Sequence, residues 1–323
     1  MLHPRLELAV EAFEPLAGPV LVLGPTDQDD LSAIASAELV VVQSFFPDHA
    51  ALKAQGYTVV DKIEAATGRF GSAVVFLPRS KPEARAMLAA AADVTDGPIW
   101  VDGAKTDGVD SIYKDLRKMG EVSDAIAKAH GKIFVTRPGD LSAWAAQPTM
   151  IDGFVTRPGV FSEGKIDRGS ALLVQALPDK LPSRMADYGA GWGYLSKTVL
   201  DRKGVAALDL VEADGIALDC ARQNITDERA SFVWTDATTY APKSAYAGIV
   251  MNPPFHTGRA GDPALGKAFI ASAARGLTTS GHLWMVANRH LPYEAELRAR
   301  FREVEEIGGD GAFKIFHASR PIR

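Results

Sequence analysis

The sequence predicts an α/β protein of two tandem domains, each a twisted, mostly parallel sheet covered by helices. Three observations lead to this prediction. The chain has 323 residues, of which 47% are hydrophobic and 23% charged, as is typical of a globular protein with two domains. After residue 165 short apolar runs alternate with helical patterns, the order expected for parallel strands joined by crossover helices. Segments of the N-terminal half also recur in the C-terminal half at a nearly constant offset.

The recurring segments indicate a duplication. Residues 96–101 (DGPIWV) resemble residues 280–285 (SGHLWM) at an offset of 184, and residues 131–134 (GKIF) resemble residues 313–316 (FKIF) at an offset of 182. Two matches at almost the same offset indicate two copies of one domain rather than a solenoid of short repeats.

A segment rich in turn residues separates the two copies. It is bracketed by Thr-Arg-Pro-Gly at residues 136–139 and again at 156–159. We expect a first domain at residues 1–140, a linker at 141–157 and a second domain at 158–323.

The charge is unevenly divided between the copies. Residues 1–150 carry 14 Lys and Arg against 20 Asp and Glu, whereas residues 151–323 carry 21 against 20. The net charge of −5 neither indicates nor excludes a nucleic-acid partner, because affinity depends on local basic patches. A candidate patch in the second copy comprises Arg259, Arg289, His290, Arg298, Arg300, Arg302 and Lys314, and its alternative is a solvated helix face of alternating charge.

Composition also bounds the location of the protein. No run of about 18 apolar residues occurs, and the N-terminus lacks the charged-then-apolar pattern of a secretion signal. We therefore expect a cytoplasmic protein without membrane contact. Cys220 is the only cysteine, which excludes an internal disulfide and a cysteine metal cluster.

A glycine loop follows the first apolar run of the second copy. Gly189, Gly191 and Gly193 lie between the strand pattern ending near Asp187 and a helical pattern beginning at Leu195. Glycines let the backbone turn tightly and approach a ligand without Cβ clashes. Taken alone, such a loop is equally a structural turn.

Acidic residues end the next two strand patterns. Glu212 lies about 20 residues beyond the loop, the spacing at which a carboxylate accepts ribose hydroxyls in doubly wound folds. Asp209 lies inside the same strand pattern and is less suited to that role. Asp236 and Ala237 follow the run at residues 231–234, where an acid can accept the amino group of an adenine.

A fourth polar element follows the apolar run at residues 247–251. Asn252 offers an amide acceptor, and Pro253 and Pro254 lack N–H groups, so this turn can hold an exocyclic amine while Phe255 stacks on the attached ring. Such contacts would aim the nitrogen lone pair at an electrophile, as methylation of an amino group requires. The alternative is an ordinary loop turn.

Together these elements resemble the class I S-adenosylmethionine-dependent methyltransferases: D-x-G-A-G-x-G, a ribose acid, an adenine acid and N-P-P-F follow in that order. Further segments resemble the bacterial ribosomal small-subunit methyltransferase C family, namely residues 158–162, 165–173, 286–288, 291–293 and 313–315. The resemblance covers residues about 155 to 320, and large-subunit guanine-N2 methyltransferases share many of these motifs. Ala190 stands where relatives commonly have cysteine.

The resemblance implies a seven-stranded sheet whose last strand is antiparallel, and transfer of a methyl group from S-adenosylmethionine to the exocyclic N2 of a guanine in 16S rRNA. It assigns cofactor contacts to Asp187, Gly189, Ala190, Gly191, Gly193, Glu212, Asp236, Ala237 and Asn252. It assigns catalysis to Asn252, Pro253, Pro254 and Phe255, and RNA contacts to Phe161, Phe255, His256, Arg289 and Lys314. No metal is required, and His256 either takes the amine proton or only shapes the site.

The first copy lacks these motifs. Residues 20–27 keep one glycine of the loop, and Phe-Leu-Pro-Arg at 76–79 replaces N-P-P-F, so we expect a degenerate methyltransferase fold that docks RNA or stabilises its neighbour. The expected partner is small-subunit rRNA, free or within the assembled subunit, and the expected state is a monomer.

Other functions remain open. Alternative substrates are large-subunit rRNA, adenine N6 and protein glutamine N5. A non-catalytic assembly factor would have a broken cofactor loop, and a nicotinamide-dependent oxidoreductase would not require the Asn252 turn.

Overall fold

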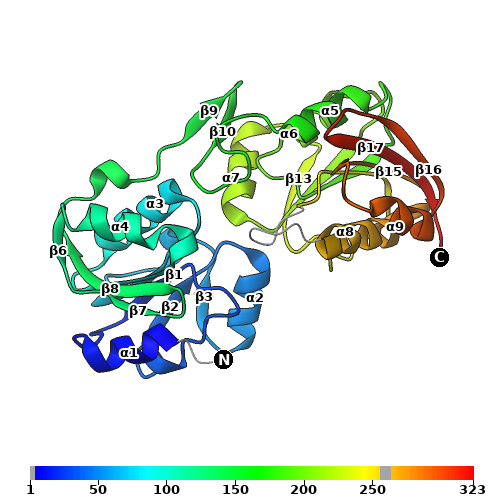
Figure 1. The fold of residues 1–323 in the computed structure, drawn as a ribbon. Helices are drawn as coiled ribbons and strands as arrows, with labels where there is room; N and C mark the ends of the chain where they lie inside the picture. The colour runs from blue at the N-terminus through cyan, green and yellow to red at the C-terminus, as the bar shows by residue number, and fades with distance from the viewer. Residues whose placement is uncertain (1–3, 255–262) are drawn as a thin grey trace. The chain divides into compact units, whose positions relative to one another are not determined.

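The computed structural model describes residues 4–254 and 263–323, which form two compact units. The first unit comprises Met1–Pro148 and Arg157–Gly159, and the second comprises Thr149–Thr156 and Val160–Arg323 (Figure 1). Within the described residues, no helix has both the length and the apolar character needed to cross a membrane.

The first unit is a sheet with the strand order β3-β2-β1-β4-β5-β8-β6, to which β7 adds by pairing with β8. Strands β1 to β5 are parallel, and β8 runs antiparallel to β5. Its strands are β1 (Val20–Leu23), β2 (Leu39–Val42), β3 (Thr58–Val60), β4 (Ser72–Phe76), β5 (Ile99–Ala104), β6 (Gly120–Val122), β7 (Ile126–Lys128) and β8 (Gly131–Pro138). Its α-helices are α1 (Pro4–Ala12), α2 (Phe46–Ala54), α3 (Lys81–Val94) and α4 (Val109–Leu116).

The second unit opens with a hairpin of β9 (Thr149–Ile151) and β10 (Phe154–Thr156), followed by a sheet with the order β13-β12-β11-β14-β15-β17-β16. The sheet strands are β11 (Arg184–Tyr188), β12 (Ala207–Glu212), β13 (Ala230–Trp234), β14 (Tyr246–Met251), β15 (Leu277–Asn288), β16 (Phe301–Gly309) and β17 (Phe313–Pro321). The helices are α5 (Arg168–Ala176), α6 (Tyr194–Asp201), α7 (Gly215–Asn224), α8 (Pro263–Gly276) and α9 (Tyr293–Arg300).

The two sheets have the same topology. In each, the third, second, first, fourth and fifth strands are parallel neighbours, and an antiparallel last strand adds beside the fifth. The matched segments fall on equivalent strands, since residues 131–134 lie on β8 and residues 313–316 on β17. The predicted α/β fold of two tandem domains, each a mostly parallel sheet covered by helices, is confirmed, and both domains are Rossmann-like. The seven strands expected are found in the second unit, whereas β7 raises the first sheet to eight.

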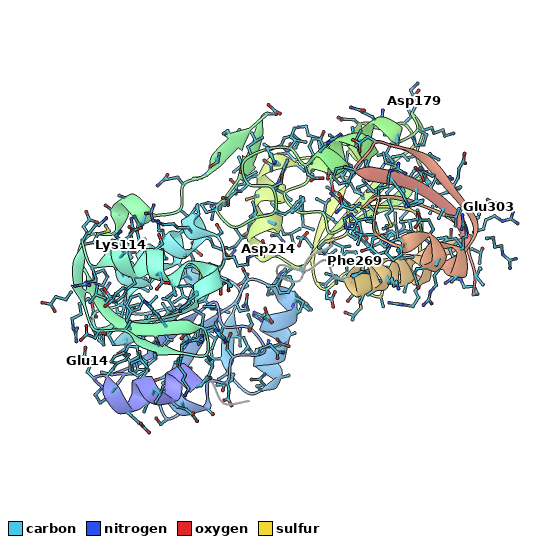
Figure 2. The ribbon with its side chains drawn as sticks, in the orientation of Figure 1. Glu14, Lys114, Asp179, Asp214, Phe269 and Glu303 are labelled. Atoms are coloured by element: carbon cyan, nitrogen blue, oxygen red, sulfur yellow. The ribbon has the colours of Figure 1, made fainter. Side chains whose placement is uncertain are left out.

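Helices cover both faces of the second sheet because its strands are apolar on both sides. Ile249 and Met251 of β14 are fully buried in one cluster with Phe269 of α8 (labelled in Figure 2). Val250, between them, points to the other face and belongs to a cluster with Leu195 of α6. Each such aliphatic side chain contributes roughly 1.5–3 kcal/mol of burial free energy. Helices α8 and α9 thus cover one face, and α5, α6 and α7 the other.

A buried ion pair ties α1 to the first sheet. Arg5 Nε donates to Asp102 Oδ1 at 2.6 Å and Arg5 Nη2 donates to Asp102 Oδ2 at 2.7 Å. Arg5 Nη1 also donates to the carbonyls of Lys128 and Ala129, both at 3.3 Å. Because Arg5 is 9% exposed and Asp102 2%, either charge would be left without its opposite in a poorly solvated place if its partner were removed.

Truncating one member should therefore destabilise the first unit strongly. We expect Asp102→Ala to cost about 3–5 kcal/mol, because it leaves the guanidinium buried without its counter-ion. Hydrogen exchange of the full chain, followed on peptides covering β5 and β8, measures the loss locally. The double variant Arg5→Met, Asp102→Leu should lose much less than Asp102→Ala. Equal losses would show that the destabilisation does not come from the uncompensated charge that Asp102→Ala leaves behind.

Candidate functional site

The candidate site lies at the carboxyl ends of the central strands of the second unit. Tyr188, the last residue of β11, is in register with Val211 of β12 on one side and Met251 of β14 on the other. The strand order reverses at β11, and ligands of open parallel sheets bind in the crevice that such a reversal opens. The glycine loop, Glu212 and Asn252 all follow strands that end at this edge.

A pocket at this edge brings together several parts of the second unit. It combines the glycine loop, Asn252, the start of α5 and an upstream segment that carries the half-exposed Phe161. Its lining comprises Phe161, Ser162, Asp167, Ser170, Gly189, Ala190, Gly191, Trp192, Tyr194, Leu195 and Asn252. Gly193 of the loop and the neighbouring Glu212 are not among the residues that line the pocket.

The glycines of the loop have different reasons to be glycine. Gly189, Gly191 and Gly193 all have positive φ, of 75°, 54° and 94°. A Cβ on Gly193 would lie 2.8 Å from Ile225 Cδ1, so this end of the loop is closely packed, and its φ of 94° itself favours glycine. A Cβ on Gly191 would meet no atom of the described residues within 4 Å, so among these residues this part of the loop is open to a ligand.

Glu212 holds the loop through its side chain. Its Oε2 accepts from the backbone N–H of Gly191 at 2.7 Å and its Oε1 accepts from that of Asp214 at 2.8 Å. Burial raises the pKa of Glu212 to about 7, although these two N–H groups favour the charged form. The Ala213 N–H is a third donor to Glu212, which leaves at least one of the about four lone pairs of the carboxylate for a ligand hydroxyl.

Asp187 is a fully buried acid near the end of β11, just before the loop. Its Oδ2 accepts from the Ser196 hydroxyl at 2.7 Å, and its Oδ1 has no hydrogen-bond partner within the described part of the chain. Burial raises the pKa of Asp187 to about 7, and the nearby Glu212 carboxylate adds to the rise.

The other two acids considered from the sequence have structural partners. Asp209 accepts from the Tyr246 hydroxyl at 2.6 Å and from Arg184 Nη2 at 3.2 Å. Asp236 accepts from the backbone N–H of Thr238 at 2.8 Å and from its hydroxyl at 2.7 Å, which organises the turn after β13. Asp236 and the buried Ala237 lie outside the pocket lining, so their role toward adenine stays a prediction.

The Asn252 amide is fixed by two acceptors. Its Nδ2 donates to Asp167 Oδ2 and to Ser170 Oγ, each at 2.9 Å, so both amide hydrogens are used and Oδ1 remains an acceptor. Pro253 is buried and Pro254 exposed, whereas Phe255 and His256 lie outside the described residues, as does Arg259.

Asp167 and Ser170 were not predicted as site residues. An Asp just before an apolar helical pattern signals a helix N-cap, which Asp167 is, with Ser170 N donating to its Oδ2 at 2.7 Å. That signal gives no information about Asn252, which lies 85 residues further along the chain.

The segment before the domain proper is held against the glycine loop. Trp192 Nε1 donates to the Phe161 carbonyl at 2.9 Å. Asn224 Oδ1 accepts from Val155 N at 2.6 Å, while its Nδ2 donates to the carbonyls of Val155 at 2.9 Å and Trp192 at 2.8 Å. Residues 149–156, which the sequence assigned to a linker, thus form a hairpin fastened to the second unit.

The predicted RNA-contacting cations lie apart from the pocket lining. Arg289 Nη2 donates to Glu306 Oε1 at 2.9 Å, and Lys314 forms an ion pair with Glu294. A direct contact of either cation with RNA stays a prediction.

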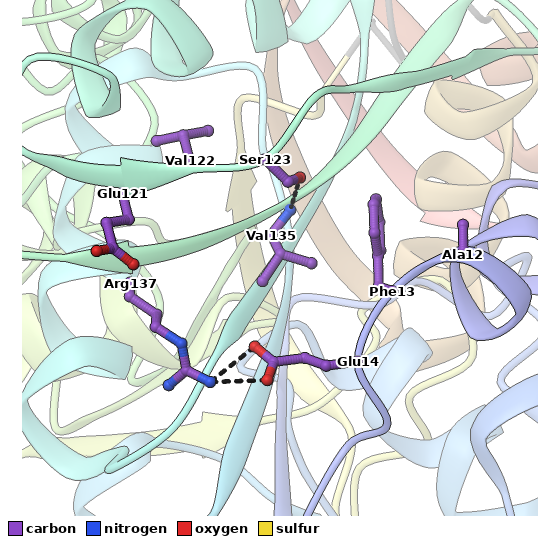
Figure 3. Close-up of a pocket in the computed structure, with 8 residues that line it drawn as sticks. All are labelled: Ala12, Phe13, Glu14, Glu121, Val122, Ser123, Val135 and Arg137. Atoms are coloured by element: carbon purple, nitrogen blue, oxygen red, sulfur yellow. Dashed lines mark hydrogen bonds and ion pairs between the residues drawn. The ribbon is translucent and has the colours of Figure 1, made fainter.

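Another cavity lies in the first unit, and two of its lining side chains, Arg137 and Glu14, form an ion pair (Figure 3). Arg137 Nη2 donates to both carboxylate oxygens of Glu14, at 2.7 and 2.9 Å, and Ser123 Oγ accepts from Val135 N at 3.0 Å. The cavity lies beside β6 and β8, away from the carboxyl ends of the parallel strands. Nothing in this arrangement resembles the pocket of the second unit.

The first copy also differs at the position of the glycine loop. Gly24 follows β1 with a φ of 70°, but a Cβ there would lie 2.6 Å from Met87 Cε. A side chain of α3 thus occupies the space beside Gly24, whereas the nearest described atom to a Cβ on Gly189, its counterpart in the second copy, would be Phe269 Cε1 at 3.6 Å. After β4 comes the buried Leu77 in place of Asn252, in agreement with a degenerate first copy.

Comparison with known proteins identifies relatives over nearly the whole chain. The family described as Methyltransferase small domain matches residues 152–317, and Methyltransferase small domain N-terminal matches residues 10–136. The chain is 30% identical to Ribosomal RNA small subunit methyltransferase C of Pseudomonas aeruginosa, over 99% of this chain and 100% of the relative. It is 28% identical to the protein of the same name from Hahella chejuensis, over 94% and 95% of the two chains.

A solved structure has the same architecture. The 16S rRNA N2 methyltransferase of T. thermophilus, determined in complex with AdoMet and guanosine, matches with a TM-score of 0.80 and 24% identity, covering 98% of this chain and 92% of that one. This likeness shows that the tandem fold is shared. The chain therefore belongs to the Methyltransferase small domain family and, through its full-length relatives, to the ribosomal RNA small subunit methyltransferase C family.

Proposed function

We propose that the chain transfers the methyl group of S-adenosylmethionine to the exocyclic N2 of a guanine in 16S rRNA. The observation that carries this proposal is Asn252, whose amide is fixed with Oδ1 as the remaining acceptor in a pocket formed with the glycine loop. Family membership supports the reaction, and the guanosine in the T. thermophilus complex supports the base.

The residues of the pocket edge fit the cofactor. The open position at Gly191 gives room for a close backbone approach, and the carboxylate of Glu212 suits ribose hydroxyls. Asp236 and Ala237 are the proposed adenine contacts. When bound, S-adenosylmethionine supplies a methyl group on a cationic sulfur, which is already an activated electrophile.

The role of the protein is then to orient the amine. The lone pair of guanine N2 is delocalised into the ring, so hydrogen bonds from N2–H to Asn252 Oδ1 and to the Pro253 carbonyl would localise it and aim it at the methyl group. Phe255 and the exposed Phe161 would hold the base after it leaves its stack. The proton is released to water in this proposal, and His256 shapes the site.

The wider context follows from the substrate. The pocket lining comes entirely from one unit of one chain, so we expect the monomer to be active. A ribosomal RNA substrate implies action in the cytoplasm, on free RNA or on the assembled subunit. The first copy would dock RNA or stabilise the second. In the second copy, Arg289 and Lys314 are candidate phosphate contacts, once RNA phosphates replace Glu306 and Glu294 as their partners.

Cofactor binding should depend on pH in a defined direction. The pKa values of Asp187 and Glu212 are raised to about 7, so both acids gain charge as the pH rises through that value. Carboxylates accept stronger hydrogen bonds than carboxylic acids, and they attract the cationic cofactor. Calorimetry should show one site per chain and an affinity that increases about 10-fold between about pH 6 and about pH 8.

Glu212→Gln should weaken cofactor binding by about 1.5–3 kcal/mol and flatten this pH dependence. Glu228→Gln, which removes an exposed carboxylate, serves as the control and should change neither. The stability of the cofactor-free protein should depend on pH in the opposite direction. Because Asp187 and Glu212 bind protons more tightly in the folded state, they stabilise the fold at low pH, and this contribution is lost as the pH rises through about 7. Two equivalent cofactor sites, or an unchanged affinity for Glu212→Gln, would contradict the assignment.

Asn252→Ala should separate chemistry from cofactor binding. Loss of an acceptor that acts mainly in the transition state should lower turnover at least about 100-fold, while cofactor affinity changes little. Single-turnover methylation of ribosomal substrate measures the rate, and Gln223→Ala, an exposed amide on α7, is the matched control. Retention of half the wild-type rate would mean that the Asn252 turn is structural.

A further inference from the structure

We propose that Asp167 and Ser170 are positioning residues that determine which end of the Asn252 amide faces the substrate. The inference rests on the proposed function and adds two side chains to it. Both residues line the pocket, and both accept an amide hydrogen of Asn252.

The chemistry of the acceptors sets the orientation. An ionised carboxylate has no hydrogen to donate, so the Asn252 NH₂ group must face Asp167 Oδ2. The reversed amide would place Oδ1 against that carboxylate and forfeit the hydrogen bonds to Asp167 and Ser170. Oδ1 is therefore the end of the amide left for the substrate, and an exocyclic amine needs an acceptor there rather than a donor.

The carboxylate is itself fixed by the first turn of α5. Asp167 is the N-cap, and its Oδ2 accepts from Ser170 N at 2.7 Å in addition to Asn252. Gly169 makes room for this arrangement, since a Cβ there would lie 3.1 Å from Asp167 Oδ2 and 3.1 Å from Phe313 Cε1. Helix capping and amide orientation thus use the same oxygen.

The negative charge also strengthens the acceptor. A carboxylate that accepts from the NH₂ end of an amide polarises it and increases the negative charge on the carbonyl oxygen. That oxygen is the atom proposed to hold the guanine amine, whose nitrogen becomes positive as the methyl group is transferred. Asp167 would act through Asn252 without contacting the base.

Asp167→Ser tests the positioning role while preserving the helix. Serine is a good N-cap, but its shorter side chain does not reach the amide, so turnover should fall about 10- to 100-fold. The affinity for S-adenosylmethionine and the KM for ribosomal substrate should change little, because the loss is in orientation. Asp167→Asn keeps an oxygen acceptor and a good N-cap, and it should recover most of this loss.

An exchange of the two groups gives a sharper test. Asn252→Asp places two carboxylates face to face and should be nearly inactive. Adding Asp167→Asn restores a donor–acceptor pair in the opposite direction and should raise turnover at least about 10-fold over Asn252→Asp alone. A purely structural role at Asp167 does not produce this recovery.

The outcomes separate the two proposals. Wild-type turnover of Asp167→Ser would overturn the positioning role. So would a double variant Asn252→Asp, Asp167→Asn that is no faster than Asn252→Asp, provided that Asp167→Asn alone is active. If Asn252→Ala is inactive in the same assay, the proposed function stands even so. If Asn252→Ala is active, the proposed function itself fails. Thermal unfolding identifies a misfolded Asp167→Ser, in which case the exchange decides.

Discussion

Hydrogen bonding between the glycine loop and the end of β12 holds the candidate site in place. The N–H groups of Gly189 and Ala190 both donate to the Val211 carbonyl, at 2.8 and 3.2 Å, and that of Gly191 donates to the Glu212 side chain. Three successive loop amides are thus directed at one neighbouring strand, which keeps a loop of positive φ from relaxing into a wider turn. This arrangement keeps two acids, the fully buried Asp187 and the partly buried Glu212, away from bulk water, and desolvation raises both pKa values to about 7.

Sequence patterns could predict the fold and the positions of strand ends, because alternating apolar runs and turn residues are local signals. They located the glycine loop, Glu212 and Asn252 on one sheet edge for that reason. Local sequence patterns could not identify the side chains that complete the site. Asp167 meets Asn252 across 85 residues, and Asn224 meets Val155 across 69, and neither pairing leaves a local trace. Likewise, no pattern distinguished a capping aspartate from one that also orients an amide.

The two copies have the same topology but differ at the carboxyl edge of the sheet, where only the second copy has the proposed cofactor site. Gly24 and Gly189 come directly after equivalent strands with positive φ, yet a Cβ on Gly24 would lie 2.6 Å from Met87 Cε, whereas one on Gly189 would lie no closer than 3.6 Å to any described atom. Near the corresponding edge of the first sheet, Asp102 is neutralised by Arg5 instead of facing a ligand. Buried charge serves the fold in one copy and the proposed chemistry in the other, which explains how the first could lose its motifs and keep its strand order.

That shared strand order has a consequence for how the chain folds. Two neighbouring repeats with the same sheet offer each strand a second place to insert, and such mispairing is a characteristic hazard of tandem domains. The difference between the two hydrophobic cores reduces this mispairing, because a strand that carries Asp102 would bring an uncompensated charge into the core of the second repeat. During synthesis the first repeat also emerges before its homologue exists, so it can close its sheet alone. The extra strand β7 completes that sheet differently from the second one, so the repeats are not interchangeable as templates.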